Sequence, residues 1–558
     1  MSPSPDRPHP PRAKRAGLDL DLPRICSLGP GALEPDDHYR LKTYGVCAQR
    51  HDDLFMLRMR VPGGILDAAQ VASVLEASRR YGHGWVHLTT RQNLELHSVR
   101  LEDVPAIDDI LRPAGLVGRS ACGHTVRNVM ACPEATTSIE EPFDVTPDAL
   151  RLSRALVERG DELNVALPSR INIVLGGCNS CGLDALTNDI GLVARVRDGE
   201  PGYQLWCGGS LGSAPRLSFL LRPFISRHEV WPAVWTILEW FCAEGDIDQL
   251  AKGRLKFVLA DKGEAAFRKA FAKRFAAWRE EPQPPLAPVD VVAPEDLDRS
   301  LARAPASGWR DGVRPERRPG LATVTVRAPL GDLLAEELGH IAALAPGGSV
   351  MLTRDQNIAL RSVPVADVPF VVGSIAQLGL GPDGVRGAVD VRVCPGLSFC
   401  SLAITGSQQV ALDIKRSLDL RPDLPRDVSI AVSGCPNSCT RHQAADIGLA
   451  GGKVKVGPRV GLGYQVFLGA DVAAGQVGEP VVRVLEEEAP RGVVAVVEVW
   501  AALRRPGEHP GQTFRRVGLD VVASAVALRL RGDEHEVGED AGTAAPAAGE
   551  LMALAGAS

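Results

Sequence analysis

Four of the twelve cysteines are spaced as ligands for a thiolate-bound metal centre. Cys394 and Cys400 form a C-x5-C pair, and Cys435 and Cys439 follow as a C-x3-C pair. Two pairs of soft thiolates are the ligand set of an iron–sulfur cluster. Zinc is the weaker alternative, because its paired cysteines are usually separated by about two to four residues. Buried free thiols are a further alternative, and a disulfide pair is disfavoured because the sequence has no secretory signal.

The chain around these cysteines contains three characteristic stretches, Val393–Cys400, Ser433–Cys439 and Ala445–Gly448. Together they resemble the sirohaem- and [4Fe-4S]-containing assimilatory nitrite and sulfite reductases, and the resemblance extends from about Tyr39 to about Val482. The resemblance implies that the four motif cysteines bind the cluster and that Cys439 also bridges to the sirohaem iron. It implies six-electron reduction of nitrite to ammonia or of sulfite to sulfide, with electrons from a separate ferredoxin or flavoprotein.

Several arginines match basic motifs of the same family. Arg58 and Arg60 lie in a stretch similar to its R-x-R-x-P-G-G motif, Arg91 in one similar to T-x-R-Q, and Arg127 in Val126–Val129. Guanidinium groups neutralise oxyanions and carboxylates. The resemblance therefore implies that Arg58 and Arg127 contact the substrate and that all four arginines contact the sirohaem. The ordinary alternative for each is a solvated surface arginine.

Another basic block departs from the family pattern at Leu167–Asn172. Arg170 stands where a lysine is expected, and a guanidinium does not readily give up a proton. Arg170 is therefore expected to clamp an anion rather than to deliver protons. Asn172 resembles the nitrite-type enzymes, and its neutral amide donor slightly favours nitrite over sulfite.

The remaining cysteines and two histidines allow more than one interpretation. Cys178 and Cys181, with Cys122 and Cys132, could bind a second metal centre or could be thiols packed as small apolar groups. Cys26, Cys47, Cys207 and Cys242 stand alone and are interpreted as structural. His124 and His442 could relay protons near the pocket or be ordinary hydrogen-bonded histidines.

An internal repeat organises the chain into two related halves. Leu88–Val99 aligns with Leu352–Val363 without a gap, and Gly177–Leu192 aligns with Gly434–Leu449. In the second alignment Cys178 falls on Cys435, whereas Cys439 falls on Gly182, and the pair formed by Cys394 and Cys400 has no matching cysteine pair in the first half. One half thus keeps a complete ligand set, so one cluster and one sirohaem are expected.

Each half begins with a small α+β unit. In the first half, strands are predicted over 54–62, 85–90 and 94–99, and helices over 67–81 and 103–111. In the second, strands are predicted over 323–328 and 350–363, with a helix over 333–344. The predicted fold class is α+β, with a pseudo-twofold repeat of ferredoxin-like small units and larger units that bind the sirohaem and the cluster.

The expected domain order follows from this repeat. The seven segments are a disordered start at 1–38, a ferredoxin-like half-domain at 39–117, a large α+β domain at 118–280, a linker at 281–319, a second ferredoxin-like half-domain at 320–385, a second large domain at 386–532 and a disordered tail at 533–558.

Composition sets the broad class of the protein. The chain has 558 residues, 45% of them hydrophobic, and a net charge of −6. This balance is typical of a soluble protein and gives no sign of nucleic-acid binding. With no long apolar run and no signal peptide recognised, the expectation is a cytoplasmic monomer that does not bind membranes.

Two other functions remain open. Some relatives with this fold carry the cluster and modify a corrinoid ring, as in precorrin-3B synthase, and the altered block at Arg170 keeps that possibility. A non-catalytic electron-transfer or metal-binding protein would use the four cysteines alone. A nicotinamide or flavin domain within the chain is disfavoured, since no glycine-rich fingerprint follows a predicted strand.

Overall fold

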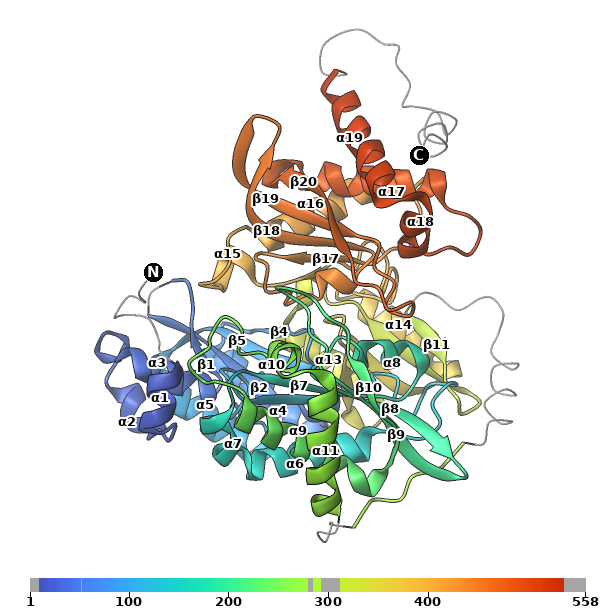
Figure 1. Cartoon of the computed structure of the whole chain (residues 1–558). Helices are drawn as coiled ribbons and strands as arrows, with labels where there is room; N and C mark the ends of the chain where they lie inside the picture. Colours follow the sequence, from blue (N-terminus) through green and yellow to red (C-terminus); the bar gives the residue numbers. More distant parts are fainter. Residues whose placement is uncertain (1–9, 52, 280–284, 293–311, 536–558) are drawn as a thin grey trace. The chain divides into compact units, whose positions relative to one another are not determined.

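The computed structural model describes residues 10–51, 53–279, 285–292 and 312–535 (Figure 1). The chain divides into two units. The first comprises Met1–Ser210 and Arg216–Pro382, and the second comprises Leu211–Pro215 and Asp383–Ser558.

The first unit opens with a five-stranded sheet in the order β1-β2-β5-β4-β13. Its strands are β1 (Val46–Ala48), β2 (Leu54–Arg60), β5 (Asn93–Arg100), β4 (Trp85–Leu88) and β13 (Asp332–Leu334). Its helices are α4 (Ala68–Tyr81) and α5 (Val104–Leu111). Helix α4 begins where the Asp67 carboxylate accepts a hydrogen bond from the backbone N–H of Gln70. The predicted strands and helices of this half-domain are confirmed to within a few residues at their ends.

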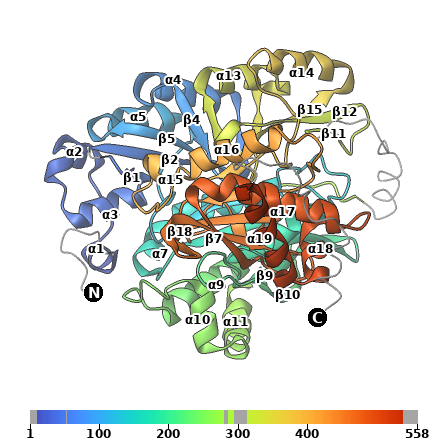
Figure 2. The same ribbon diagram turned by 90° about the horizontal axis from the view of Figure 1, so that it is seen from above.

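A second small sheet of the same unit has the order β11-β12-β15-β14-β3. Its strands are β11 (Val313–Pro315), β12 (Leu321–Val326), β15 (Ile358–Pro364), β14 (Val350–Leu352) and β3 (Ile65–Leu66), and its helices are α13 (Ala335–Leu344) and α14 (Val368–Ala376). Strands β3 and β13 are exchanged, because each pairs with the sheet of the other half. Helices α4 and α13 lie side by side, as Figure 2 shows, and both sheets share one hydrophobic core.

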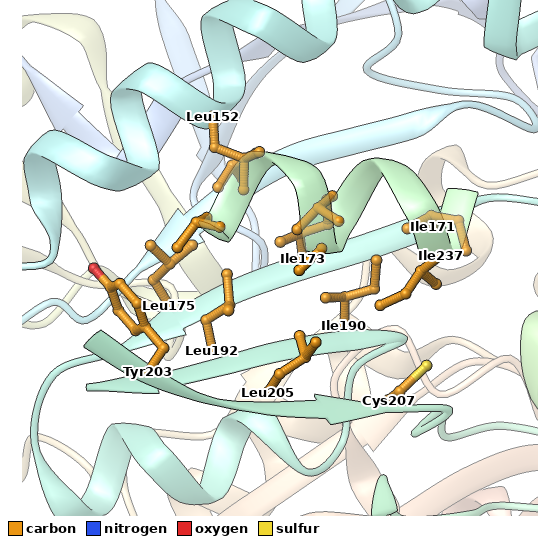
Figure 3. Packing of buried hydrophobic residues seen from close by; sticks show 14 of the residues in the cluster. Leu152, Ile171, Ile173, Leu175, Ile190, Leu192, Tyr203, Leu205, Cys207 and Ile237 are labelled. Carbon is orange, nitrogen blue, oxygen red and sulfur yellow. The ribbon is translucent and has the colours of Figure 1, made fainter. Parts of the chain in front are cut away.

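The third sheet of the first unit has the order β10-β9-β8-β7-β6. Its strands are β6 (Val126–Ala131), β7 (Ile171–Gly176), β8 (Ile190–Arg197), β9 (Glu200–Cys207) and β10 (Phe219–Ser226). Strands β6, β7 and β8 are parallel, whereas β9 and β10 are antiparallel to their neighbours. Side chains such as Ile173, Leu192 and Leu205 pack on one face of this sheet (Figure 3). The helices of this part are α6 (Thr146–Glu158), α7 (Gly160–Ala166), α8 (Asn179–Ala185), α9 (Val230–Glu244), α10 (Leu255–Lys262) and α11 (Glu264–Arg279).

The second unit repeats this sheet in the order β16-β17-β18-β19-β20. Its strands are β16 (Arg392–Val393), β17 (Ile430–Ser433), β18 (Ile447–Val456), β19 (Arg459–Leu468) and β20 (Glu479–Leu485). Its helices are α15 (Gly396–Phe399), α16 (Ser407–Asp419), α17 (Ala489–Leu503), α18 (Pro510–Val517) and α19 (Leu519–His535). The α+β class and the duplication predicted from the sequence are therefore present.

Strand register corrects one detail of the sequence alignment. Ala131 pairs with Leu175 in the first large sheet, and Val393 pairs with Val432 in the second. The residue that follows each pair is Cys132 in one case and Cys394 in the other. Cys394 thus has a counterpart in the first half, which the gapless alignment did not find.

The expected disordered start and tail are wrong for the described residues that they include, and the expected linker contains a strand. Helices α1 (Pro10–Ala16), α2 (Leu22–Ser27) and α3 (Pro35–Thr43) occupy most of the segment 10–43, which overlaps the expected disordered start. The expected linker includes strand β11, and α19 continues to His535. Residues 1–9 and 536–558, the rest of the predicted disordered ends, lie outside the described residues. No helix among the described residues is long and apolar enough to cross a membrane.

Candidate functional site

The four motif cysteines lie at one end of the sheet in the second unit. Strands β16 and β17 are parallel neighbours, so their carboxyl ends meet at the same edge. Cys394 directly follows β16, and Cys435 follows β17 after Gly434. Cys400 follows α15, the short helix that begins two residues after Cys394. The C-x5-C spacing is therefore one helical turn between two ligands.

Electrostatic interactions link the four thiols to one another. Burial and the charge of Cys439 raise the pKa of Cys394 to about 12. Burial and the charges of Cys439 and Cys400 raise the pKa of Cys435 to about 11. The backbone N–H of Gly434 donates to Cys394 Sγ at 3.1 Å. Such N–H···S contacts stabilise thiolates bound to a metal cluster.

The environment of Cys439 differs from that of the other three. Cys435 is buried and Cys394 and Cys400 are half-buried, whereas Cys439 is exposed. A sulfur that binds a cluster and is also open on its other side can reach a second cofactor. The donor set fits a thiolate-bound cluster, and the exposure of Cys439 is compatible with its expected bridging role.

The first unit gathers the arginines that the sequence singled out. Burial and the nearby charges of Arg58 and Arg91 lower the pKa of Arg127 to about 10, although the Cys122 thiolate opposes this shift. The Arg127 guanidinium donates to the backbone carbonyls of Ala121 and Gly123. Arg58 of β2, Arg91 of the β4–β5 turn and Arg127 of β6 thus lie in one half-buried basic region. Burial would lower the pKa of Arg58, but the charges of Cys122 and Glu95 raise it above its ordinary value.

Further cations surround His124 in the same unit. Burial lowers the pKa of His124 to about 3, and the charges of Lys14, Arg127 and Arg170 lower it further, with a smaller contribution from Lys42. His124 is consequently neutral at physiological pH and cannot supply a proton as an imidazolium. Its Nδ1 is buried and has no hydrogen-bond partner among the described residues.

Two buried lysines were missed by the sequence interpretation. Lys14 of α1 donates to the carbonyl oxygens of Leu167 and His124, and burial lowers its pKa to about 8. Burial and the charges of Arg254 and Arg170 lower the pKa of Lys256 in α10 to about 8, against the opposing charge of Asp189. Lys14 lies in the basic start of the chain, which was expected to be disordered, and Lys256 has no family motif around it.

Cys47 and Cys122 form a pair that the sequence did not predict. Cys47 donates a hydrogen bond to Cys122, which with Arg58 and Arg127 lowers the pKa of Cys122 to about 6 despite burial. Arg58 Nη1 donates to Cys122 Sγ at 3.1 Å and Nε donates to Glu95 at 2.6 Å. Cys47 is therefore not solitary, and Cys122 belongs to this basic region rather than beside Cys132.

Arg60 is almost completely buried, at 1% exposure, and its partners are protein groups. Its Nη2 donates to Ser153 Oγ at 3.2 Å and to the carbonyl oxygen of Arg127 at 3.4 Å. Burial and the charge of Arg127 lower its pKa to about 10. The face of β2 that carries Arg58 and Arg60 thus points toward β6, a question that strand alternation left open.

Asn172 makes a hydrogen bond that changes its predicted role. Its backbone N–H and its side-chain Nδ2 both donate to Asp189 Oδ2, at 2.9 and 3.1 Å. Ser429 makes the equivalent contacts to Asp446 in the second unit. The amide donor is therefore engaged in holding a turn that both halves share, and the preference for nitrite loses this support.

His442 is buried in the second unit. Its Nδ1 lies 3.1 Å from Ser433 Oγ, and burial lowers its pKa to about 3. The proton-relay interpretation of both histidines is accordingly disfavoured, since each is neutral across the physiological range.

The charge balance of the first unit indicates what it would bind. Cations that repel one another in a partly buried region are stabilised when an anion is bound among them. Sirohaem carries many carboxylates, and nitrite and sulfite are small oxyanions. Arg58, Arg91, Arg127, Arg170 and Lys14 are suited to such partners in type and charge.

Comparison with known proteins agrees with this chemistry. The family described as nitrite and sulphite reductase 4Fe-4S domain matches residues 122–277 and 384–533, and the nitrite/sulfite reductase ferredoxin-like half domain matches residues 48–114. A ferredoxin–nitrite reductase of Synechococcus elongatus is 32% identical over 470 residues, which cover 81% of this chain and 87% of the relative. A ferredoxin sulfite reductase of Mycobacterium tuberculosis is 28% identical over 427 residues, covering 74% and 73%.

A solved structure extends the comparison to the whole fold. The structure of the NirA protein of Mycobacterium tuberculosis matches with a TM-score of 0.78 and 25% identity, covering 93% of this chain and 97% of that chain. The corrinoid-modifying and non-catalytic alternatives are not favoured by these comparisons. The chain belongs to the nitrite and sulphite reductase family, whose cofactors are a [4Fe-4S] cluster and sirohaem.

Proposed function

We propose that this chain reduces nitrite to ammonia with electrons from a reduced ferredoxin. Its identity to a ferredoxin–nitrite reductase is 32%, against 28% for a ferredoxin sulfite reductase. The observation that carries the chemistry is the basic region in which Arg58 donates to Cys122, Arg127 donates to the carbonyl oxygens of Ala121 and Gly123, and Lys14 donates to that of His124. A compact anion would be drawn there and held by charge-assisted hydrogen bonds.

The cysteines of the second unit would hold the electron relay. In this proposal Cys394, Cys400, Cys435 and Cys439 would hold the [4Fe-4S] cluster, and Cys439 would also link it to the sirohaem. When bound, the sirohaem supplies the iron at which the anion is reduced. Gly434 orients the ligand Cys394 through its N–H, a contact that also tunes the sulfur.

The basic residues of the first unit would divide between binding and proton supply. Arg58, Arg91 and Arg127 bind the sirohaem carboxylates or the anion, and Arg60 supports β6 behind them. Arg170 clamps the anion because a guanidinium remains protonated. Lys14 and Lys256, with pKa values of about 8, are ammonium groups at neutral pH that can give up a proton from Nζ.

Turnover of nitrite and of sulfite, measured side by side, tests the substrate. We expect reduced ferredoxin to support ammonia formation with a higher kcat/KM for nitrite than for sulfite. Reduced methyl viologen serves as a donor that needs no docking surface. A higher kcat/KM for sulfite with both donors would contradict the substrate assignment. Turnover that methyl viologen supports and reduced ferredoxin does not would contradict the ferredoxin assignment.

The variant Cys439→Ser tests the bridging role. We expect loss of turnover of either anion, because the link between the two redox centres is broken. Cys26→Ser is the matched control, since Cys26 is a buried thiol in the core of the small sheets. Near-normal rates in Cys439→Ser would show that another residue bridges the cofactors.

A further inference from the structure

Three buried cysteines converge in the first unit, away from the motif cysteines in sequence. Cys132 follows β6, Cys178 follows β7, and Cys181 lies on α8. Their sulfur atoms all lie within 4.8 Å of one another, and those of Cys132 and Cys178 are 3.5 Å apart. Exposure of the three residues is 2% or less. Parallel pairing of β6 with β7 brings the first two together at one edge of the sheet.

These distances suit a single tetrahedral ion. A zinc–sulfur bond of about 2.3 Å in tetrahedral geometry separates neighbouring sulfurs by about 3.8 Å. A [4Fe-4S] cube binds each cysteine through a different iron atom and so holds the sulfurs farther apart. Among the cysteine, histidine, aspartate and glutamate side chains of the described residues, these three form the group of three or more whose ligand atoms all lie within 4.8 Å of one another.

Carboxylates next to the thiols could complete the coordination. Cys178 donates a hydrogen bond to Glu134 Oε2 at 3.8 Å. Glu141 is fully buried, and its Oε1 has no hydrogen-bond partner among the described residues. A Cβ added to Gly177, the neighbour of Cys178, would lie 2.4 Å from that oxygen. The Oε2 of Glu141 accepts a hydrogen bond from the backbone N–H of Thr136 at 2.6 Å, so the acceptor that remains open beside Cys178 is Oε1.

A buried arginine can offset the charge of the thiolates. The Arg354 side chain is 4% exposed and forms an ion pair with Asp184 at 2.7 Å. Burial alone would lower its pKa, but the charges of Asp184, Cys181 and Cys132 raise it above its ordinary value. A site of three thiolates and one carboxylate around a divalent ion keeps a net negative charge, so a cation beside it is favourable.

We propose that Cys132, Cys178 and Cys181 bind one zinc ion, and that Glu134, which lies beside Cys178 but outside this tight group, moves in as the fourth ligand. The site would be the first-half counterpart of the cluster site, since Cys132 matches Cys394 by strand register and Cys178 matches Cys435 in the repeat. Metal binding displaces the thiol protons, and the ion then ties β6, β7 and α8 together. The ordinary alternative is three thiols packed within the hydrophobic core that contains them.

Metal analysis of the purified, cofactor-loaded enzyme tests the site. We expect about one equivalent of zinc in the unaltered protein and its loss in Cys132→Ser and Cys178→Ser, with the cluster and sirohaem iron unchanged. Cys207→Ser is the matched control, because Cys207 is a buried thiol of the same core (Figure 3). Zinc at background level in the unaltered protein, even after incubation with zinc under reducing conditions, would overturn the proposal.

A second measurement does not depend on folding of the variants. Zinc X-ray absorption of the unaltered enzyme should show sulfur ligands at about 2.3 Å with one oxygen, and a mercurial that blocks thiols should release the zinc to a dye. Iron beyond that of the cluster and sirohaem would point to a second cluster instead. A disulfide-linked peptide containing Cys132 and Cys178, found in freshly isolated protein, would also contradict the proposal.

Discussion

At the scale of single residues, burial makes several cationic charges of the first unit unfavourable. Arg127 and Arg60 have pKa values lowered to about 10, and Lys14 and Lys256 have values lowered to about 8. Burial is the first cause in each case. In the proposed function, an anion bound among these groups would relieve that cost. Arginine holds its charge at any physiological pH, whereas lysine makes the charge dependent on pH.

Nitrite binding should weaken as the pH rises through about 8. Lys256 is protonated below its pKa of about 8 and neutral above it, so its attraction for an anion is present at pH 7 and lost toward pH 9. We expect KM for nitrite to increase over this interval in the unaltered enzyme and to vary less in Lys256→Arg, which keeps its charge. Steady-state kinetics from pH 6.5 to 9.5 measure both.

The control for this pH profile is Lys262→Met. Lys262 is an exposed lysine on the same helix, 3.7 Å from Glu244. Its replacement should leave the pH dependence as it is in the unaltered enzyme. If KM for nitrite in Lys256→Arg changes with pH as it does in the unaltered enzyme, the pH dependence comes from another group. Lys14 is then the next residue to replace.

Arg127→Ala should reduce nitrite binding far more than stability. The guanidinium braces the carbonyl oxygens of Ala121 and Gly123, yet its removal also relieves repulsion with Arg58 and Arg91. We expect KM for nitrite to rise about 10- to 100-fold, or about 1.4–2.8 kcal/mol, with a small change in melting temperature. Arg112→Ala, at an exposed arginine paired with Asp109, is the control. A loss confined to melting temperature would make Arg127 a structural residue.

At the scale of elements, ligands are placed where parallel strands end. The sequence predicted the strands around 54–99 and 323–363 and the gapless repeat of Leu88–Val99, because those segments carry a strong local pattern. It did not predict β3 or β13, since strands of two or three residues have no readable periodicity. Lys14 was missed because its contact with Leu167 joins residues far apart in the sequence.

The turn after β16 requires glycine at position 396. Gly396 has φ of 56°, and a Cβ there would lie 2.3 Å from Ser407 Oγ. Gly396→Ala should cost about 1–2 kcal/mol from the left-handed backbone alone, with a further cost from the clash. Since α15 carries the chain from Cys394 to Cys400, we expect reduced iron and acid-labile sulfide per chain.

Gly452→Ala provides the matched control in the same unit. Gly452 lies in β18, and a Cβ there would meet nothing within 4 Å. Its substitution should leave cofactor content and melting temperature unchanged. Full cluster content in Gly396→Ala, measured by iron and sulfide analysis and by the visible spectrum, would show that the turn tolerates a side chain.

At the scale of the whole molecule, duplication has been followed by division of labour. Each half supplies a small sheet and a large sheet, and the large sheets keep the same strand order and the same register. The Asn172–Asp189 contact and the Ser429–Asp446 contact occupy equivalent turns. The basic region was retained in one half and the complete set of motif cysteines in the other. The sequence reveals the duplication. It does not show which residue of a matching pair has a structural role, because that role depends on contacts that form only when the chain folds.

The two small sheets are joined by a reciprocal pair of glutamines. Gln92 Nε2 donates to the carbonyl oxygen of Leu352 at 2.9 Å, and Gln356 Nε2 donates to that of Leu88 at 3.1 Å. Both side chains are buried. Either substitution to alanine leaves a buried carbonyl without its donor, which should cost about 1–3 kcal/mol.

A double-mutant cycle shows whether the two halves stabilise one another through this pair. Both hydrogen bonds lie at the interface between the two small sheets, beside the exchanged strands β3 and β13. Loss of one should therefore weaken the other. We therefore expect Gln92→Ala and Gln356→Ala together to cost less than the sum of the single losses, by at least about 0.5 kcal/mol, in urea unfolding of the first unit. Gln409→Ala, at an exposed glutamine on α16, should have little effect. Additive losses in the cycle would mean that the two small sheets are held independently, with the strand exchange alone joining the halves.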